Sequence, residues 1–501
     1  MEKRIIEKNR RKELLYTLFA IFGCLMIAYL PFMQTHYSSD SYANANGIDV
    51  AIHLRNGRVV TYFVQSLFNL IKFNPVNHQA ITVGTFICIL TLSVLLIYRE
   101  IVTYVQDSLQ KKVVILGGLL VVYINVFFAE WFLYVESLTS FSVGIILVTA
   151  AAAYASRGIN IKNLIISCLF LMCALNMYQL YIEFFLVLSL LIVYVRFEGR
   201  LKQEALICSM AVVGEGAIAS VLTIILHPLL IRGFGMQPPD RMATFNIQAI
   251  LANAKEIFRG QEAIWSNSLG LLPQGLLLGT IFILIILFLI QRGRDKDANG
   301  IVYGFLALLF VPMIIFAPHI ISTMVWMAPR TIVGIFHVVT VLLIMIGVGG
   351  QKEKKDICVV IAASIMCIYM LVSMYSINGI IVNNIATNHL DEALAVQIER
   401  GIQEYQGETG VAVTKIAAVN DESPTYIYDG VRYVSHDMNI RGLVVQWAGV
   451  ELINHYCDRE YQKVEMPDDI YDTYFRGKNW DYFDLNEQAV FDGDTLYLAM
   501  Y

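Results

Sequence analysis

The sequence predicts an all-α, polytopic membrane domain followed by a small α/β domain, and three observations carry this prediction. Of the 501 residues, 57% are hydrophobic and only 15% are charged, with a mean hydropathy of +0.60, which excludes an ordinary soluble globular protein. Long apolar segments recur throughout residues 1–378. Beyond Gly379 the composition changes, because 21 of the 41 acidic residues but only 8 of the 36 basic residues follow it.

The first part of the chain holds the predicted membrane spans. Each apolar segment is close to the roughly 20 residues that a helix needs to cross the hydrocarbon core. We predict about eleven transmembrane helices, at residues 15–32, 79–98, 113–129, 138–155, 163–177, 180–195, 205–228, 271–290, 301–318, 331–349 and 357–378. The two spans on either side of Tyr178 could instead form one long helix, in which case the C-terminal domain would lie in the cytoplasm.

The basic residues between these segments predict an orientation. They cluster at residues 3–12, 99–112, 157–162, 196–202, 292–296 and 352–355, all on one side of the predicted membrane. Because cytoplasmic loops carry the excess of Lys and Arg, this side is the cytoplasmic one. The opposite side then receives a first outer loop at residues 33–78, a long loop at 229–270 and the C-terminal domain at 379–501. The apolar run at 15–32 lacks a small-residue cleavage site and is predicted to be a retained first span.

The C-terminal domain has the alternating pattern of a small α/β fold. Residues 390–405 are typical of an amphipathic helix, and residues 411–419 of a buried strand. Residues 443–456 are predicted to be helical, and two further strands are expected at 488–491 and 495–500 around a glycine turn.

Several classes of function are excluded or disfavoured by composition. Lys and Arg lie singly or in short groups between apolar segments and not on one soluble face, which disfavours a nucleic-acid partner. Seven of the eight cysteines fall inside apolar segments without metal-ligand spacing, so neither a disulfide framework nor a zinc site is predicted. No glycine-rich nucleotide-binding pattern and no internal repeat occurs in the sequence.

The loop at residues 33–78 combines the residue types that a transfer reaction at a membrane surface needs. Asp40 can act as a general base on an acceptor hydroxyl that it reaches directly or through one water. His53 and Arg58 add positive charge, and arginine holds phosphate by paired, charge-assisted hydrogen bonds. Residues 59–73 carry apolar side chains at helical spacing, which predicts a helix lying along the membrane surface. These features favour an enzyme whose substrate has a lipid tail and a phosphate head.

Spacing alone leaves plainer explanations open. Asp40 could be a solvated loop residue. Arg58 and Arg330 stand at the outer ends of apolar runs, where they could reach lipid phosphate. Glu136 could cap the N-terminus of the fourth span.

Polar residues inside apolar stretches have similar alternatives. Tyr178, Gln179 and Glu183 interrupt an apolar stretch at its outer end, where they could make contacts between helices. Glu215, deep in the seventh span, is either a buried hydrogen-bonded acid or a proton site. His337 is typical of an interhelical hydrogen-bonding residue.

Five features occur in a recognisable order along the chain. They are an acid in the first outer loop, a Gly-Arg pair about eighteen residues later, an acid opening the fourth span, the run ALNMYQLYIEFFL and the Pro-Arg of WMAPRTIVG. In this order they resemble the GtrII-type glucosyltransferase family over residues 15–374. The C-terminal stretch WDYFDLNEQAVFDGDTLYLAMY is also similar to the end of such proteins.

That family is similar to the wider GT-C glycosyltransferases, multispanning enzymes that take a sugar from a polyprenyl-phosphate carrier and add it to an acceptor outside the cytoplasm. The resemblance maps the family's functional positions onto Asp40, Gly57, Arg58, Glu136, Tyr178, Gln179, Pro329 and Arg330. Family members often show two adjacent acids in the first loop, whereas here Ser39 precedes Asp40. This departure favours a single base over a paired-carboxylate metal site.

The leading hypothesis is therefore an inverting membrane glycosyltransferase of the bacterial cytoplasmic membrane. It moves glucose from a polyprenyl-phosphate carrier to an extracytoplasmic cell-envelope glycan, with Asp40 as general base and Glu136 orienting the acceptor or the sugar. The donor's phosphate and sugar are expected to meet Arg58, Arg330, Tyr178, Gln179, His53 and Glu183. The metal requirement stays open, and a divalent metal ion is the only cofactor considered.

Three other classes remain as alternatives. A flippase or transporter of a lipid-linked glycan would carry functional charges deep in several spans, often in repeated halves, and only Glu215 fits that pattern. A surface-polysaccharide polymerase or ligase would place its dominant loop late in the chain and rely on arginines. A structural or sensory protein would have no outer cavity lined by Asp40 and Arg330.

Overall fold

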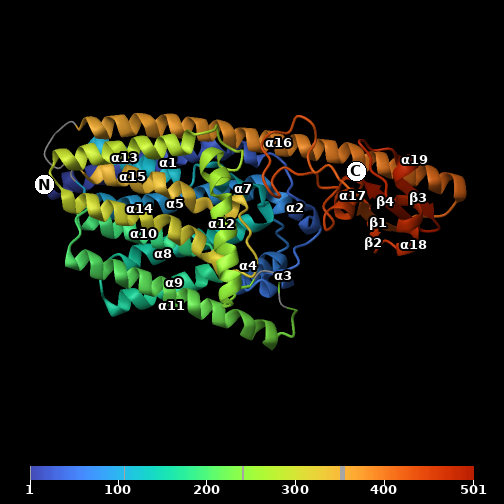
Figure 1. Ribbon diagram of the computed structural model, residues 1–501, viewed down its shortest axis with the longest axis horizontal. Helices are drawn as coiled ribbons and strands as arrows, with labels where there is room; N and C mark the ends of the chain where they lie inside the picture. Colours follow the sequence, from blue (N-terminus) through green and yellow to red (C-terminus); the bar gives the residue numbers. More distant parts are fainter. Residues whose placement is uncertain (1, 106–107, 238, 240–241, 350–355) are drawn as a thin grey trace.

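Long helices running along a common axis make up most of the molecule, and a smaller part containing a β-sheet lies beyond one end of the bundle (Figure 1). The computed structural model describes residues 2–105, 108–237, 239, 242–349 and 356–501. We call the end of the bundle that faces the sheet the site end; it carries α2 (Ser39–Asn44), α3 (Ala51–Arg55) and α4 (Val59–Leu70). The N-terminus lies at the opposite end, which we call the basic end.

Seven helices in the described part of the chain are long and apolar enough to cross a membrane, or eight if one bent pair is a single span. The seven are α1 (Glu2–Tyr29), α5 (Gln79–Val102), α8 (Val135–Ala155), α11 (Gln203–Gly233), α13 (Leu276–Arg294), α14 (Ala298–Ile320) and α16 (Ile357–Thr409). The bent pair is α6 (Leu109–Val121) with α7 (Val126–Leu133), which meet at an angle of 49°.

Each of the eleven predicted spans coincides with a helix, but eleven crossings remain a prediction. Eight of the predicted spans fall on the seven long helices and the bent pair. The other three fall on short helices, α9 (Ile161–Leu175), α10 (Tyr181–Arg196) and α15 (His337–Val348). Helices of 15 and 16 residues rise only about 23 Å, less than the roughly 30 Å of a hydrocarbon core. The stretch around Tyr178 is not one long helix, because α9 ends at Leu175 and α10 starts at Tyr181.

The predicted cationic loops come together at the basic end. Arg157 is 3.0 Å from Glu100, which joins the α8–α9 loop to the end of α5. Lys112 at the start of α6 is 2.6 Å from Glu13 in α1. The predicted basic group at Lys352, Lys354 and Lys355 lies outside the described residues.

Short elements cover the site end of the bundle. Besides α2, α3 and α4 they are η1 (Leu30–Met33), η2 (Val76–His78), α12 (Ile247–Asn267), η3 (Pro329–Thr331) and η4 (Val333–Phe336). In α4 the polar Thr61 and Gln65 are buried against the bundle, whereas Phe63 and Leu67 are exposed. This arrangement is that of a helix whose apolar face is turned outwards, as expected for a helix on a membrane surface. Helix α12 crosses the axes of its neighbours (Figure 1).

The C-terminal part is carried by α16, an unbroken helix of 53 residues that passes through the domain boundary predicted at Gly379. The amphipathic stretch predicted at 390–405 is the far end of this helix rather than a separate one. Four strands form one sheet, and the order across the sheet is β2 (Gln462–Lys463), β1 (Lys415–Asn420), β4 (Thr495–Met500) and β3 (Ala489–Asp492). The remaining elements are α17 (Gly449–Cys457), α18 (Asp468–Ile470), the π-turn η5 (Tyr471–Phe475) and α19 (Leu485–Gln488).

Two separate apolar cores stabilise these parts. The bundle core is rich in aromatic rings at the site end, where Tyr29 stacks on Phe132 and Phe128 on Trp131. In the sheet, β1 and β4 pair in parallel over six residues, and β3 and β4 form the predicted antiparallel pair. The sheet's core packs against the far end of α16 and α17.

Candidate active site

A cavity of about 1040 Å³ lies at the site end of the bundle, and five of the eight predicted site residues line it. They are Asp40, Arg58, Tyr178, Gln179 and Arg330. This volume is at the upper end of the range usual for small-molecule sites. His53, Glu136 and Glu183 do not line the cavity.

Asp40 stands in the first turn of α2, and the local sequence explains why a helix starts there. Ser38 caps the helix: its hydroxyl accepts the N–H of Ser41 at 3.2 Å, and the Ser41 hydroxyl accepts the N–H of Ser38 at 3.1 Å. This reciprocal capping box satisfies two otherwise unpaired N–H groups. The half-buried Asp40 carboxylate reaches the cavity and accepts a hydrogen bond of 3.0 Å at Oδ1 from the indole N–H of Trp447.

The groups around Asp40 shift its pKa in opposite directions. Burial raises the pKa of the Asp40 carboxyl above its ordinary value. The cation of Arg330, the Trp447 hydrogen bond and the cation of Arg58 each act to lower that pKa, whereas the nearby carboxylate of Asp437 raises it further. The net effect is a carboxyl whose pKa is raised, so it holds its proton more strongly than an exposed aspartate does.

Glu136 lies behind α2 and not in the cavity. It sits in the first turn of α8, is buried, and accepts a 2.9 Å hydrogen bond at Oε2 from the Ser41 hydroxyl. Its main-chain oxygen accepts the side-chain amide of Gln65 from α4 at 2.8 Å. Glu136 therefore joins α2, α4 and α8, and it holds the helix turn that carries Asp40.

Arg330 is fixed by a carboxylate from each side. Its guanidinium and its backbone N–H both contact the buried Glu130 of α7. Its other Nη donates to Asp437 at 3.1 Å, and Tyr134 lies beneath it, with the ring centroid 4.4 Å from Cζ. The Trp131 indole donates to the Arg330 carbonyl at 3.0 Å. The Pro-Arg turn is thus clamped to α7 with its cation facing the cavity.

Arg58 lies over the ring of Tyr178, with Cζ 5.1 Å from the centroid. The turn before it requires glycine, because Gly57 has a φ of +71° and a Cβ there would be 2.8 Å from the His227 ring. His227 lies on α11, and its Nε2 is 2.9 Å from the Arg55 carbonyl oxygen. Gly57 therefore lets α11 approach α3 closely and directs Arg58 toward Tyr178.

The other predicted donor-site residues have different positions. Gln179 is exposed at the cavity wall and donates to the Asn56 carbonyl at 3.2 Å.

His53 is outside the cavity. Burial, together with the positive charge of Arg58, lowers the pKa of His53 to about 4, so its ring is neutral near pH 7. Glu183 is buried in α10, where its carboxylate would lie 2.6 Å from a Cβ placed on Gly334. Its position is that of a contact between α10 and η4.

The cavity changes character along its length. Away from Asp40 it is lined by apolar side chains of α10, α11 and α14, among them Leu186, Ile224 and Phe310. Phe310 stands ten residues before the end of α14 at Ile320, which places the cavity wall about 15 Å below the site end. One cavity therefore joins an acid and several cations to an apolar channel between helices.

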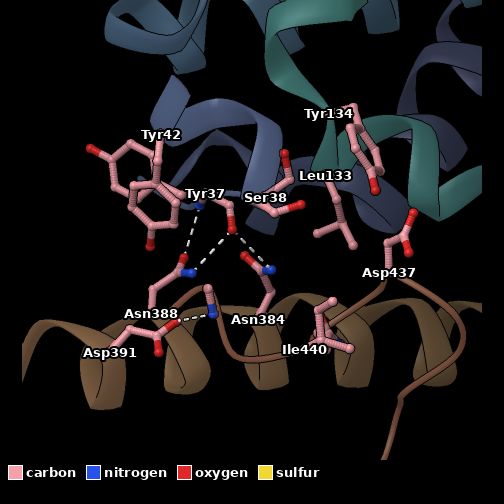
Figure 2. Close-up of a pocket in the computed structure, with 13 residues that line it drawn as sticks. Tyr37, Ser38, Tyr42, Leu133, Tyr134, Asn384, Asn388, Asp391, Asp437 and Ile440 are labelled. Carbon is pink, nitrogen blue, oxygen red and sulfur yellow. Dashed lines mark hydrogen bonds between the residues drawn. The ribbon is translucent and has the colours of Figure 1, made fainter. Parts of the chain in front are cut away.

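The C-terminal part supplies two cavity residues that the sequence did not predict, Asp437 and Trp447. Figure 2 shows how this part is attached to the first outer loop: Asn388 of α16 accepts the Tyr37 N–H at 2.8 Å and donates to the Tyr37 carbonyl at 3.0 Å. Asp391 accepts the N–H of Gly442 at 2.7 Å. Glu130 was also missed as the partner of Arg330, although a lone acid in an apolar run is itself a signal that a cation lies nearby.

Among the residues that the structure describes, no group of three or more His, Cys, Asp or Glu side chains is placed to hold a metal ion. The structure thus combines a bundle of helices long and apolar enough to cross a membrane with a cavity that is charged near Asp40 and apolar between α10, α11 and α14. The sequence profile of the family described as glucosyl transferase GtrII matches residues 29–348, and the chain belongs to this family of membrane glycosyltransferases. No curated protein and no solved structure matches the chain.

Proposed function

We propose that the protein is an inverting glucosyltransferase of the bacterial cytoplasmic membrane that takes glucose from polyprenyl phosphate and adds it to an extracytoplasmic cell-envelope glycan. The observation that supports this most is the composition of the cavity that Asp40 lines. Its Asp40 end offers a base and cations for a sugar phosphate, and its apolar channel suits the isoprenoid chain. The cationic loops at the basic end support a cytoplasmic position for that end and an extracytoplasmic one for the site.

In the proposed reaction an acceptor hydroxyl attacks C1 of the glucose from the face opposite the phosphate. The C1–O bond to the phosphate breaks, its electron pair stays on the phosphate oxygen, and the hydroxyl proton passes to Asp40. The products are an inverted glycoside and polyprenyl phosphate. A general base contributes about 10² to 10⁴ in rate to such a step.

The cations have separate tasks in this proposal. Arg58 holds the donor phosphate and stabilises the negative charge that grows on it as the bond breaks. Arg330 keeps a positive charge beside Asp40 and the phosphate while Glu130 and Asp437 fix its direction.

Tyr178 and Gln179 bind sugar hydroxyls, and Glu136 positions α2 rather than touching substrate.

The test measures transfer of radiolabelled glucose from polyprenyl phosphate by membranes that contain wild-type protein, Asp40→Asn or Arg58→Ala. Asp40→Asn keeps the shape of the side chain but cannot accept the proton, so we expect transfer to fall by about 10² or more. Arg58→Ala should raise the KM for the donor. Asp49→Asn is the matched control, because Asp49 is an exposed acid of the same loop that does not line the cavity and should keep wild-type transfer.

Full transfer by Asp40→Asn at normal expression would remove the base from the proposal. If wild-type membranes transfer none of several donor sugars, the glycosyltransferase proposal fails and a lipid-linked glycan flippase becomes the better explanation. Glu215 in α11 would then be the first residue to replace.

A further inference from the structure

We propose that Trp447 forms the acceptor side of the active site: its indole N–H holds the Asp40 carboxylate in position, and its exposed ring provides a surface on which the acceptor sugar stacks. This inference rests on the proposed glycosyltransferase function and extends it to the acceptor. It assigns a role in acceptor choice to the C-terminal part, which lies outside the stretch matched by the family profile.

The position of Trp447 is the first argument. It lines the same cavity as Asp40 although the two residues are 407 positions apart in the chain. Its side chain is 54% exposed, whereas its neighbours Val445 and Ala448 are buried. The turn thus presents a large aromatic ring at the cavity wall, and burial in the domain core does not explain its position.

The second argument is the hydrogen bonding of the Asp40 carboxylate. Oδ1 accepts the Trp447 N–H at 3.0 Å, the only side-chain hydrogen bond to this carboxylate among the described residues. Oδ2 is then the oxygen that takes the proton from the acceptor. A general base works within about 2.6 to 3.2 Å of the group that it deprotonates, so the acceptor sugar must lie beside Trp447.

The two ends of the cavity give the third argument. The donor's lipid fits the channel along α10, α11 and α14, and its phosphate fits Arg58 near Tyr178. The acceptor must approach C1 of the glucose from the opposite face. The wall left for it is the one formed by the C-terminal part, where Trp447 presents a flat apolar face that suits the C–H face of a sugar ring.

Two variants of Trp447 separate its two roles. Trp447→Phe keeps an aromatic ring but removes the N–H donor. Trp447→Leu removes the ring as well. The assay measures glucose transfer from polyprenyl-phosphate glucose to an oligosaccharide fraction from the host cell envelope, with separate KM values for donor and acceptor and a pH profile. Trp480→Phe is the matched control, since Trp480 also donates its indole N–H to a carboxylate at 3.0 Å but does not line the cavity.

For Trp447→Phe we expect the acid limb of the pH profile to move to higher pH, while the acceptor KM stays within about twofold. The sign follows from the hydrogen bond, which lowers the pKa of Asp40; without it the base stays protonated to a higher pH. The other groups that face this carboxylate, Arg330, Asp437, Arg58, Tyr134 and Glu136, are the same in both proteins.

For Trp447→Leu we expect the acceptor KM to rise about tenfold with the donor KM unchanged. Trp480→Phe should match the wild type in every readout. An unchanged acceptor KM in Trp447→Leu, or an equal rise in both KM values, would overturn the acceptor role, and an unmoved acid limb in Trp447→Phe would overturn the positioning role. Wild-type protein without any transfer would instead refute the proposed function itself.

Discussion

Arg330 contacts two carboxylates that differ strongly in burial. The side chain of Glu130 is fully buried, whereas that of Asp437 is 21% exposed. Removing one member of a buried ion pair leaves the other charge without compensation, which costs about 3 to 5 kcal/mol, while a partly exposed pair contributes at most about 1 kcal/mol. The two partners of the same arginine should therefore have different effects on stability.

We expect Glu130→Gln to lower the thermal unfolding temperature of the detergent-solubilised protein well below that of Asp437→Asn. The measurement is a thermal unfolding curve for each variant under identical conditions. The double variant Glu130→Gln/Arg330→Gln should recover part of the loss, because it buries no unpaired charge. Equal unfolding temperatures for the two single variants would contradict the assignment of Glu130 as the main partner.

Sequence patterns singled out charged cavity residues of the bundle but not those of the C-terminal part. Asp40, Arg58 and Arg330 line the cavity, and they could be singled out from the sequence because acids and arginines beside apolar segments are uncommon. Asp437 and Trp447 stand in a polar stretch where such residues are common. Their nearness to Asp40 depends on tertiary packing, which no local spacing encodes.

Among the elements, the turn between α3 and α4 sets the direction of Arg58. Gly57 allows a left-handed backbone and the close approach of His227, and both would be lost with any side chain. A left-handed residue with a Cβ costs about 1 to 2 kcal/mol, to which the clash with the ring adds.

We expect Gly57→Ala to raise the KM for the polyprenyl-phosphate donor, because the shifted turn moves Arg58 away from the phosphate. The check is donor titration in the transfer assay. Gly235→Ala is a suitable control, since Gly235 also has a positive φ, of +65°, but a Cβ there meets nothing within 4 Å. The double variant Gly57→Ala/His227→Ala should restore part of the donor affinity; a wild-type donor KM for Gly57→Ala would rule out this role of the turn.

The elements also show which sequence signals were reliable. Apolar segments located the long helices of the bundle, and the strands at β3 and β4 agree with the predicted pair. The prediction of a long loop at 229–270 was wrong, because α11 continues to Gly233 and the 21-residue α12 lies within this stretch. The strand predicted at 411–419 begins later, at Lys415, and β2 was not predicted because two residues carry no pattern. The predicted helix at 443–456 begins only at Gly449. The change of composition near Gly379 does not interrupt the helix, since α16 runs through it unbroken.

For the whole molecule, the decisive connection is that between α16 and the first outer loop. Asn388 accepts the N–H of Tyr37 and, together with Asn384, donates to the Tyr37 carbonyl, three residues before Asp40 (Figure 2). An unsatisfied buried backbone group costs about 1 to 3 kcal/mol, so this contact couples the attachment of the C-terminal part to the position of the base.

We expect Asn388→Leu to lower kcat for transfer about tenfold with little change in the donor KM, because α2 loses its support while Arg58 keeps its own. Steady-state transfer rates by the purified protein test this. Asn378→Leu provides the comparison, since Asn378 lies on the same helix and its side chain donates to the Met374 carbonyl of that helix. Equal rates for the two variants would show that the Tyr37 contact does not affect the base.

Because α16 is unbroken, its length fixes both the rotation of the C-terminal part about the helix axis and its distance along that axis from the bundle. Its 53 residues extend about 80 Å, and each residue turns the helix by about 100° while lifting it by about 1.5 Å. One residue added before Asn384 would swing Trp447 sideways around the helix axis, out of reach of Asp40. Eleven added residues would bring the phase back after about three turns, but about 16 Å too high. The number of residues in a membrane helix is therefore as much a condition for a complete active site as the residues that line it.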